Sequence, residues 1–213
     1  MIPELERVRA TLPPGIALAA VDPADVDPAA LPPEEARLVA GARPSRRREF
    51  AAGRWCARQA LRMAGMPVDA LGADRDGVPR WPHGTTGSIA HKPGLAVALA
   101  APVGVASGLG VDVEPAVGLP DTVAAATLTG AERRRSGVLP PAAAAVRRRL
   151  LFAAKEAYAK WYRAAAGGRA PGFLAGEAHV RGTDLRVVPF DPALPVATGC
   201  AITGAAWLLV VLW

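Results

Sequence analysis

Cysteine, histidine and lysine are scarce in this chain of 213 residues, which contains two, three and three of them respectively. Cys56 and Cys200 cannot supply a disulfide framework, and so few histidines do not favour a Cys/His zinc site. A reducing compartment is therefore expected. The N-terminal segment is acidic where a secretory signal would be basic, so we expect a cytoplasmic protein.

Aromatic residues make up only 5% of the chain, yet 51% of residues are hydrophobic and 21% are charged. Such a composition excludes a disordered chain, and the length is sufficient for a buried core without covalent staples. One uncharged run, Pro192–Trp213, is long enough to span a bilayer. Turn-forming residues interrupt it, so we expect a buried β-hairpin and no membrane anchor.

Positive charge exceeds negative charge, with 25 Lys and Arg against 19 Asp and Glu, and 22 of the 25 cations are arginines. Arginine triplets occur at 46–48, 133–135 and 147–149. A basic nucleic-acid-binding module is therefore one open alternative, although no nucleic-acid fold signature or interleaved aromatic residues accompany the triplets. We expect that the protein does not bind nucleic acid. A filter-binding experiment with a salt titration distinguishes this expectation from a nucleic-acid-binding module.

The order of expected elements indicates an α+β fold without regular βαβ alternation. Long helices are expected over 45–64, with Ser45 as N-cap, and over 141–166, and strands over 87–101, over 109–113 and towards the C-terminus. Thr129 and Glu132 fit a capping box. Residues 1–40 are expected to be irregular apart from a short helix opening at Glu34. We expect two halves, 1–107 and 108–213.

The segment Gly110–Glu114, of sequence Gly-Val-Asp-Val-Glu, carries the first candidate site. Side chains alternate along a strand, so Asp112 and Glu114 share one face at a separation of roughly 7 Å. Such paired carboxylates suit a hard cation such as Mg²⁺. Taken alone, the pattern favours solvated acids on a half-exposed strand.

The second candidate lies in the later long helix, where Glu156 and Lys160 are four residues apart and share a face. A surface ion pair is the plain alternative. Lys155 and Lys160 are two of the three lysines, in a chain that otherwise uses arginine. A titratable ammonium that can donate a proton distinguishes lysine from arginine.

Two further candidates point to anion binding. His91 and Lys92 lie between a strand and a Gly turn, and Arg46 and Arg54 lie on the first long helix, where guanidinium groups suit phosphate. A structural histidine and a solvated arginine face are the alternatives.

Together these blocks resemble the surfactin-synthetase and enterobactin type of 4′-phosphopantetheinyl transferase. The matching motifs are R-x-x-x-F-x-x-G-R over 46–54, G-x-P-x-W-P-x-G-x-x-G-S-x-x-H over 77–91, G-V-D-V-E over 110–114 and F-A-A-K-E-A-Y-x-K-W over 152–161. With Gly172-Phe173, the resemblance covers about two thirds of the chain. Each motif alone is weak, and their order makes the match specific.

The resemblance implies a pseudo-dimer of two similar α+β halves, each with a small antiparallel sheet and one long helix, and an active site in the cleft between them. It also implies a monomeric enzyme that moves the phosphopantetheine arm of coenzyme A onto a serine of an acyl or peptidyl carrier protein, releasing 3′,5′-ADP. Another Mg²⁺-dependent phosphoester enzyme stays open as a second alternative. Which carrier pathway is served, and whether acyl-coenzyme A is accepted, are left open.

The resemblance also assigns roles to single residues. Mg²⁺ would be held by Asp112, Glu114 and Glu156, and Glu156 would also be the base for the carrier serine. Lys160 would neutralise or protonate the leaving group. Coenzyme A phosphates would be contacted by Arg46, Arg54, His91 and Lys155, with Ser88 in the same pocket wall. The family's basic residue before the G-x-P turn is Asp76 here, so Arg75, one position earlier, is the candidate for that phosphate contact.

Overall fold

The computed structural model describes residues 2–213 and contains two compact units. The N-terminal unit comprises Leu12–Leu109, and the C-terminal unit comprises the segment ending at Thr11 together with Gly110–Trp213. These units differ from the expected halves, 1–107 and 108–213, mainly because the first residues of the chain belong with the last hundred. The fold is α+β, and both sheets are antiparallel.

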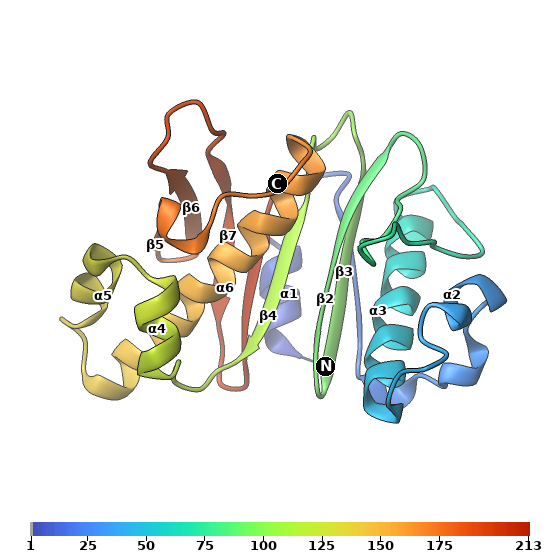
Figure 1. Ribbon diagram of the computed structural model, residues 1–213, viewed down its shortest axis with the longest axis horizontal. Coiled ribbons are helices and arrows are strands. Elements are labelled where there is room, and N and C mark those ends of the chain that lie inside the picture. Colours follow the sequence, from blue (N-terminus) through green and yellow to red (C-terminus); the bar gives the residue numbers. More distant parts are fainter. Residues whose placement is uncertain (1) are drawn as a thin grey trace. The chain divides into compact units, whose positions relative to one another are not determined.

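A three-stranded sheet and one long helix form the N-terminal unit (Figure 1). The strands are β1 (Ala17–Val21), β2 (Thr85–Lys92) and β3 (Leu95–Pro102), in the order β1-β3-β2. The helices are α2 (Pro33–Arg37) and α3 (Pro44–Met63), with short 3₁₀ turns η1 (Pro23–Asp25) and η2 (Pro28–Ala30). Alanines of α3 pack on alanines of β3, so the helix lies close to the sheet.

A five-stranded sheet in the order β4-β8-β7-β6-β5 is the centre of the C-terminal unit. Its strands are β4 (Gly110–Pro115), β5 (Gly176–Arg181), β6 (Asp184–Pro189), β7 (Ala197–Thr203) and β8 (Trp207–Leu212). Its helices are α1 (Pro3–Arg9), α4 (Asp121–Thr127), α5 (Gly130–Ser136) and α6 (Pro141–Ala165), with η3 (Phe173–Ala175).

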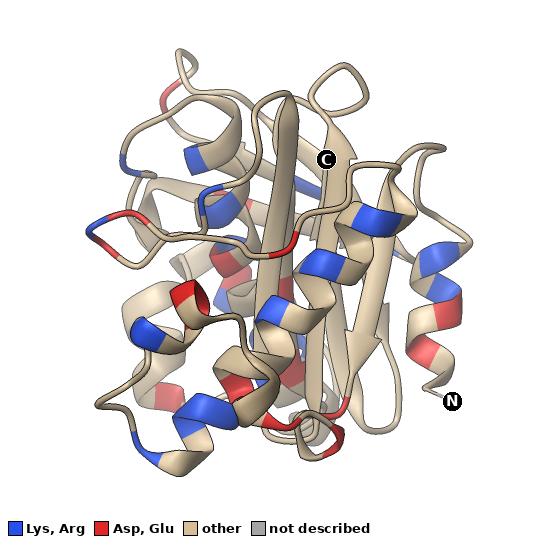
Figure 2. Ribbon diagram, turned by 90° about the vertical axis from the view of Figure 1, so that its right-hand side faces the viewer, with Lys and Arg blue, Asp and Glu red and all other residues tan. Residues whose placement is uncertain are grey.

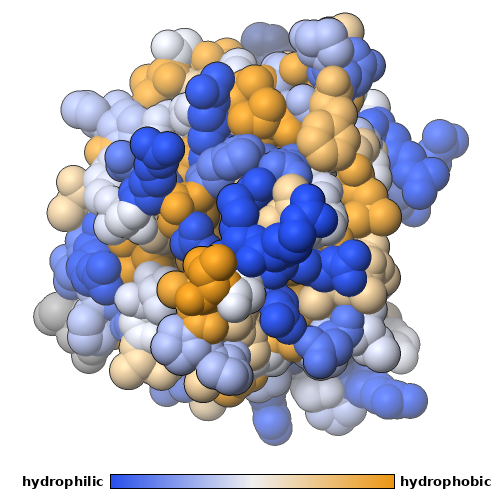
Figure 3. Space-filling model, turned by 90° about the vertical axis from the view of Figure 1, so that its left-hand side faces the viewer, coloured by the Kyte–Doolittle hydropathy of each residue, from blue (hydrophilic) through white to orange (hydrophobic). Residues whose placement is uncertain are grey.

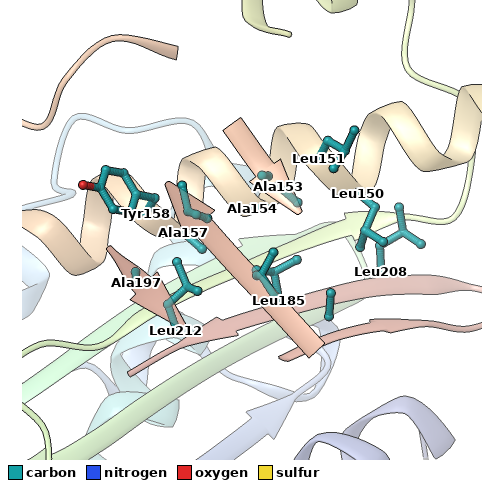
Figure 4. Packing of buried hydrophobic residues seen from close by; sticks show 14 of the residues in the cluster. Leu150, Leu151, Ala153, Ala154, Ala157, Tyr158, Leu185, Ala197, Leu208 and Leu212 are labelled. Carbon is teal, nitrogen blue, oxygen red and sulfur yellow. The ribbon is translucent and has the colours of Figure 1, made fainter. Parts of the chain in front are cut away.

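Helix α6 covers one face of this sheet. Apolar side chains on the helix meet side chains of β6, β7 and β8, as Figure 4 shows for Ala157, Leu185 and Leu212. Leu212, like Ala157, is fully buried, and Leu185 is 3% exposed. Burying such side chains stabilises the fold by about 1.5–3 kcal/mol each. The helix is therefore fixed on the sheet, and side chains elsewhere on it acquire defined positions.

Most of the expected elements are confirmed. The long helices match α3 and α6, the capping box of Thr129 and Glu132 is present at α5, and the C-terminal run forms the antiparallel hairpin β7–β8. The expected N-cap is wrong, because Arg43 occupies that position and Ser45 lies inside α3. Among residues 2–213, no helix combines the length and the apolar character needed to cross a bilayer.

Two expectations about regular structure are also wrong. Residues 1–40 contain α1 and β1, and the expected strand over 87–101 is a hairpin of β2 and β3 that turns at Gly94, whose φ is 89°. The sequence Ala-Leu-Ala-Ala-Val of β1 carries little strand preference of its own. It becomes a strand by pairing with β3, from Ala17 opposite Ala100 to Val21 opposite Ala96.

Candidate functional site

The two carboxylates of β4 share one face of the strand, as the alternation predicts. Asp112 and Glu114 lie opposite Val210 and Leu208 of β8, and those two residues belong to the core beneath α6. Both carboxylates are buried, at 7% and 2% exposure, which argues against the alternative of solvated acids on a half-exposed strand. A buried charge is retained only when it is paired or binds a cation.

Gly110 explains how α6 comes so close to these carboxylates. A Cβ atom at this position would lie 2.1 Å from the carbonyl oxygen of Ala157 and 2.9 Å from the Cβ of Trp161. No side chain fits there, so the backbone of β4 contacts the backbone of α6. The face of β4 that carries Asp112 and Glu114 is therefore the face that α6 covers.

Both carboxylates are paired with cations of α6. Lys160 Nζ donates to Asp112 Oδ1 at 2.9 Å and to the carbonyl of Val111 at 2.8 Å. Arg149 Nη1 donates to Glu114 Oε2 at 2.7 Å, and the same guanidinium donates to the carbonyls of Val117 and Gly118. The helix thus presents two fixed positive charges to one strand.

Glu156 lies on the same stripe of α6 as these two cations. It follows Arg149 by seven residues and precedes Lys160 by four, which are about two turns and one turn of an α-helix. Its side chain is half-buried. Two of the three predicted metal-binding carboxylates therefore lie on β4, and the third lies on the stripe of α6 whose cations contact β4. Arg149 lies beside these carboxylates as well, and no motif in the sequence indicated it.

The chemistry of these donors fits Mg²⁺, which prefers carboxylate oxygens and keeps several waters. In the present arrangement Lys160 and Arg149 neutralise Asp112 and Glu114. Within the described residues, the structure contains no ready-made group of three His, Cys, Asp or Glu side chains close enough to hold a metal ion together. Metal binding at this site stays a prediction.

Lys155 adjoins Glu156 in sequence but points elsewhere, because successive residues on a helix differ by about 100°. Its ammonium donates to Glu132 Oε2 at 2.7 Å, to the carbonyl of Phe173 at 2.7 Å and to the carbonyl of Thr127 at 3.1 Å. These three acceptors account for its three protons. Burial lowers the pKa of Lys155, and the hydrogen bond and charge of Glu132 oppose that change. The geometry gives Lys155 a structural role, and its predicted phosphate contact would require one of these bonds to be exchanged.

A cavity of about 370 Å³ lies beside Lys155 in the same unit. Arg163 and Arg169 also line it, and the aromatic rings of Tyr158 and Phe173 supply apolar walls. The hydroxyl of Tyr158 donates to the carbonyl of Pro195 at 2.8 Å, and burial raises the pKa of Tyr158 to about 12. The cavity can take a slender ligand that combines apolar groups with negative charge.

In the N-terminal unit, α3 and β2 bring Arg46 and His91 together. Arg46 Nη1 lies 2.8 Å from His91 Nε2, and His91 Nδ1 lies 3.4 Å from Glu49 Oε2. A guanidinium can only donate, so Nε2 accepts in this arrangement and the ring proton belongs on Nδ1, facing Glu49. Basic residues recur along the length of α3 (Figure 2).

Arg54 lies about two turns after Arg46 on α3 and is 2% exposed. Its guanidinium lies 4.9 Å from the centre of the Phe50 ring, and Nη1 donates to the carbonyl of Gly72 at 3.3 Å. Burial lowers the pKa of Arg54, the negative charge of Glu35 opposes this, and the neighbouring Arg58 lowers it further.

One cavity of about 160 Å³ joins these basic residues. Arg46, Arg54 and His91 line it together with Phe50, Gly53, Gly77, Pro79 and Ile89. The volume far exceeds the roughly 10–15 Å³ of accessible space that one water molecule needs, which leaves room for a phosphate group. Three nitrogen-bearing side chains around one small cavity are suited to an anion.

The structure separates two predicted contacts from that cavity. Ser88 is buried on β2, but it lies three positions before His91, so its side chain leaves from the opposite face of the strand. Arg75 lies exposed in a turn that Asp74 closes by accepting from the backbone amides of Asp76 and Val78. The roles of Ser88 and Arg75 towards a phosphate stay predictions.

Comparisons with known proteins agree with the resemblance. Residues 34–101 match the family model described as the 4′-phosphopantetheinyl transferase N-terminal domain. The chain is 42% identical over 132 residues to the 4′-phosphopantetheinyl transferase Svp of Streptomyces mobaraensis, covering 61% of this chain and 54% of Svp. This chain is similar to 4′-phosphopantetheinyl transferases.

Two further relatives carry the same name. Npt of Nocardia iowensis is 40% identical over 91 residues, which are 43% of this chain and 41% of Npt. PptT of Mycobacterium tuberculosis is 39% identical over 101 residues, which are 47% of this chain and 44% of PptT. The matched part thus spans about half the length of each of these relatives or less. The comparisons support an enzyme of the 4′-phosphopantetheinyl transferase class.

Proposed function

We propose that this protein is a 4′-phosphopantetheinyl transferase of the surfactin-synthetase and enterobactin type. It moves the phosphopantetheine arm of coenzyme A onto a serine hydroxyl of an apo acyl or peptidyl carrier protein and releases 3′,5′-ADP. The proposal includes Mg²⁺ as the metal, a monomeric enzyme and a cytoplasmic location. The proposal is supported by sequence similarity to three proteins that are named 4′-phosphopantetheinyl transferases, each matched over part of its own length.

The observation that carries the proposal is the stripe of α6 that faces β4. Arg149 and Lys160 hold Glu114 and Asp112, and Glu156 lies between the two cations on the same stripe. Phosphoryl transfer requires alignment and charge neutralisation more than covalent participation by the protein. Three carboxylates and two cations on facing elements supply that distribution of charge.

Each side chain of this group has a role in the proposed reaction. Glu156 accepts the proton of the carrier serine while the serine oxygen forms a bond to the phosphorus that carries the pantetheine arm. The bond between that phosphorus and the bridging oxygen of the diphosphate breaks, and Lys160 stabilises the negative charge that collects on 3′,5′-ADP. Asp112, Glu114 and Glu156 are the residues that would hold Mg²⁺, which neutralises diphosphate charge when bound.

The remaining parts of coenzyme A have candidate positions in the separate units. Arg46, Arg54 and His91 would bind its 3′-phosphate, because their cavity combines guanidinium groups with a size that suits phosphate. The 370 Å³ cavity beside Tyr158 and Phe173 would accept the pantetheine arm, which is narrow, largely apolar and interrupted by amides.

Intact-mass analysis tests the proposed function directly. Apo carrier proteins of the fatty-acid, polyketide, non-ribosomal-peptide and siderophore classes are incubated with this protein, coenzyme A and Mg²⁺. At least one carrier should gain the mass of a phosphopantetheine arm, and 3′,5′-ADP should appear in equal amount. Absence of the gain on every carrier class would overturn the proposal.

A further inference from the structure

A basic and apolar surface lies at the connection between α5 and α6, and the transferase mechanism does not use it. We call it the α5–α6 turn and define it as Arg133, Arg134, Val138 and Leu139. Both arginines are exposed, and the two apolar side chains are 84% and 42% exposed. Figure 3 views the side of the C-terminal unit on which α5 lies and shows hydrophilic side chains gathered there, with apolar ones exposed beside them.

Local hydrogen bonds and prolines fix the shape of this turn. The amide of Gly137 donates to the carbonyls of Arg133 and Arg134, and the amide of Leu139 donates to Ser136. Pro140 and Pro141 then start α6 with restricted backbone angles. The backbone of the turn is already ordered before a partner binds. Binding through Val138 and Leu139 therefore costs little additional backbone entropy.

Positive charge is concentrated around the turn. Arg135 Nη2 pairs with Glu177 Oε2 at 2.9 Å, and His179 Nε2 lies 3.8 Å from the same carboxylate oxygen. Arg147 Nη2 donates to the carbonyl of Val180. Burial lowers the pKa of Arg147, and the nearby positive charge of Arg135 lowers it further. Cations thus crowd around one carboxylate, and the surface has a net positive charge.

The distance from the turn to the candidate site matches the size of a small protein domain. Helix α6 starts at Pro141 and reaches Glu156 fifteen residues later, a rise of about 22 Å at ~1.5 Å per residue. A small domain is about 30 Å across. A small-domain partner is therefore long enough to span the length of α6 between Glu156 and the α5–α6 turn.

We propose that the α5–α6 turn is a docking surface for the carrier protein, with Arg133 and Arg134 opposite acidic residues of the carrier and Val138 and Leu139 against an apolar patch between them. The inference rests on the proposed function for the identity of the partner. Complementary charge accelerates encounter, and the central apolar contact prolongs the complex.

The test compares two double variants with the same change in net charge. Arg133→Glu/Arg134→Glu reverses the surface, and Arg37→Glu/Arg62→Glu reverses two exposed arginines of the N-terminal unit. Binding of a negatively charged apo acyl carrier protein is measured by calorimetry without coenzyme A, and transfer is measured by the mass assay. The turn variant should bind the carrier at least about tenfold more weakly and show a shallower salt dependence, with kcat and the KM for coenzyme A unchanged. Val138→Ser should weaken binding severalfold at unchanged charge.

Different results overturn different statements. Equal weakening in the control variant, or no weakening in the turn variant, would overturn the docking surface while carrier modification still supported the transferase. Charge-dependent carrier binding without any arm transfer would retain the surface and reject the transferase. Loss of duplex DNA binding, with carrier binding intact, would assign the arginines to nucleic acid.

Discussion

Lys155 and Glu132 form a buried ion pair in which Nζ and Oε2 are 2.7 Å apart and the two side chains are 5% and 0% exposed. The Glu132 carboxylate also accepts hydrogen bonds from the backbone amides of Thr129 and Ala178, at 2.8 and 2.7 Å. One carboxylate thus joins the start of α5, the strand β5 and the middle of α6. Lys155, the neighbour of Glu156 on α6, is held by this pair, which fixes the segment of the helix that carries Glu156.

Replacing Glu132 should therefore destabilise the C-terminal unit severely. Glu132→Ala removes the partner of a buried ammonium and leaves two backbone amides without their acceptor, which is expected to cost about 3–5 kcal/mol. Lys155→Met should cost less, since Glu132 keeps its two amide donors. Urea unfolding measures both, with the exposed Glu34→Ala as control. A Glu132→Ala variant as stable as the control would contradict the structural role of this pair.

Arg149 should be exchangeable for a divalent cation, whereas Arg148 should not. Arg149 faces Glu114, whose side chain is 3% exposed, but Arg148 pairs with Asp121, whose side chain is 90% exposed. Arg149→Ala should lower the unfolding temperature in the absence of metal because a buried carboxylate loses its counter-charge. Mg²⁺ should raise that temperature more in Arg149→Ala than in the wild type.

The matched variant Arg148→Ala should lose little stability, because exposed ion pairs contribute about 0–1 kcal/mol. Thermal unfolding with and without Mg²⁺ is a sufficient measurement, and it requires no carrier protein. An identical response to Mg²⁺ in all three proteins would argue against a metal at Glu114.

Glu156→Gln separates the two duties assigned to that residue. Glutamine keeps the shape and one coordinating oxygen but removes the charge and the basicity. Stability should be nearly unchanged at this half-buried position, and turnover in the mass assay should fall at least about a hundredfold. High Mg²⁺ should restore only part of the loss if Glu156 is both base and ligand. Complete recovery would leave the ligand role alone, and full activity at ordinary Mg²⁺ would exclude both.

Arg46→Ala should weaken the binding of coenzyme A by removing a contact to its 3′-phosphate. The guanidinium of Arg46 lines the 160 Å³ cavity, while Arg48 lies on the same turn of α3 outside that lining. Arg46→Ala should weaken binding of coenzyme A about tenfold or more and change the binding of dephospho-coenzyme A little. Arg48→Ala serves as the control for lost positive charge. Equal losses for both ligands would show that Arg46 does not recognise the 3′-phosphate. Arg54 is less suitable for this experiment, since its burial over Phe50 also contributes to folding.

The residues with periodic or turn-forming neighbours were predictable from the sequence. Proline and glycine marked the bounds of α3 and α6, and strand alternation placed Asp112 and Glu114 on one face. Arg149 was not predictable in this way, because its role depends on the close approach of α6 to Gly110. The spacing of seven residues before Glu156 was the signal that could have identified it.

Lys155 has surroundings that its position in the sequence did not indicate. Its position beside Glu156 and the resemblance to the transferases both suggested a phosphate contact. The 100° step of the helix instead turns it towards Glu132, a residue of another helix that the sequence does not connect to it. Ser88 could have been placed from strand parity alone, since an odd separation from His91 puts the two side chains on opposite faces.

The pairing of β4 with β8 has a consequence for synthesis on the ribosome. Gly110 lies opposite Leu212, so the strand that carries Asp112 and Glu114 acquires its neighbour only when β8, about a hundred residues later in the chain, has emerged. The N-terminal unit is continuous from Leu12 to Leu109 and can fold while translation proceeds. Helix α1, although it precedes the N-terminal unit in the chain, must wait for β7 and β8, which it contacts. Pairing of the strand that carries Asp112 and Glu114 therefore waits for β8, and a chain interrupted before residue 207 would contain the N-terminal unit but not the neighbour of β4.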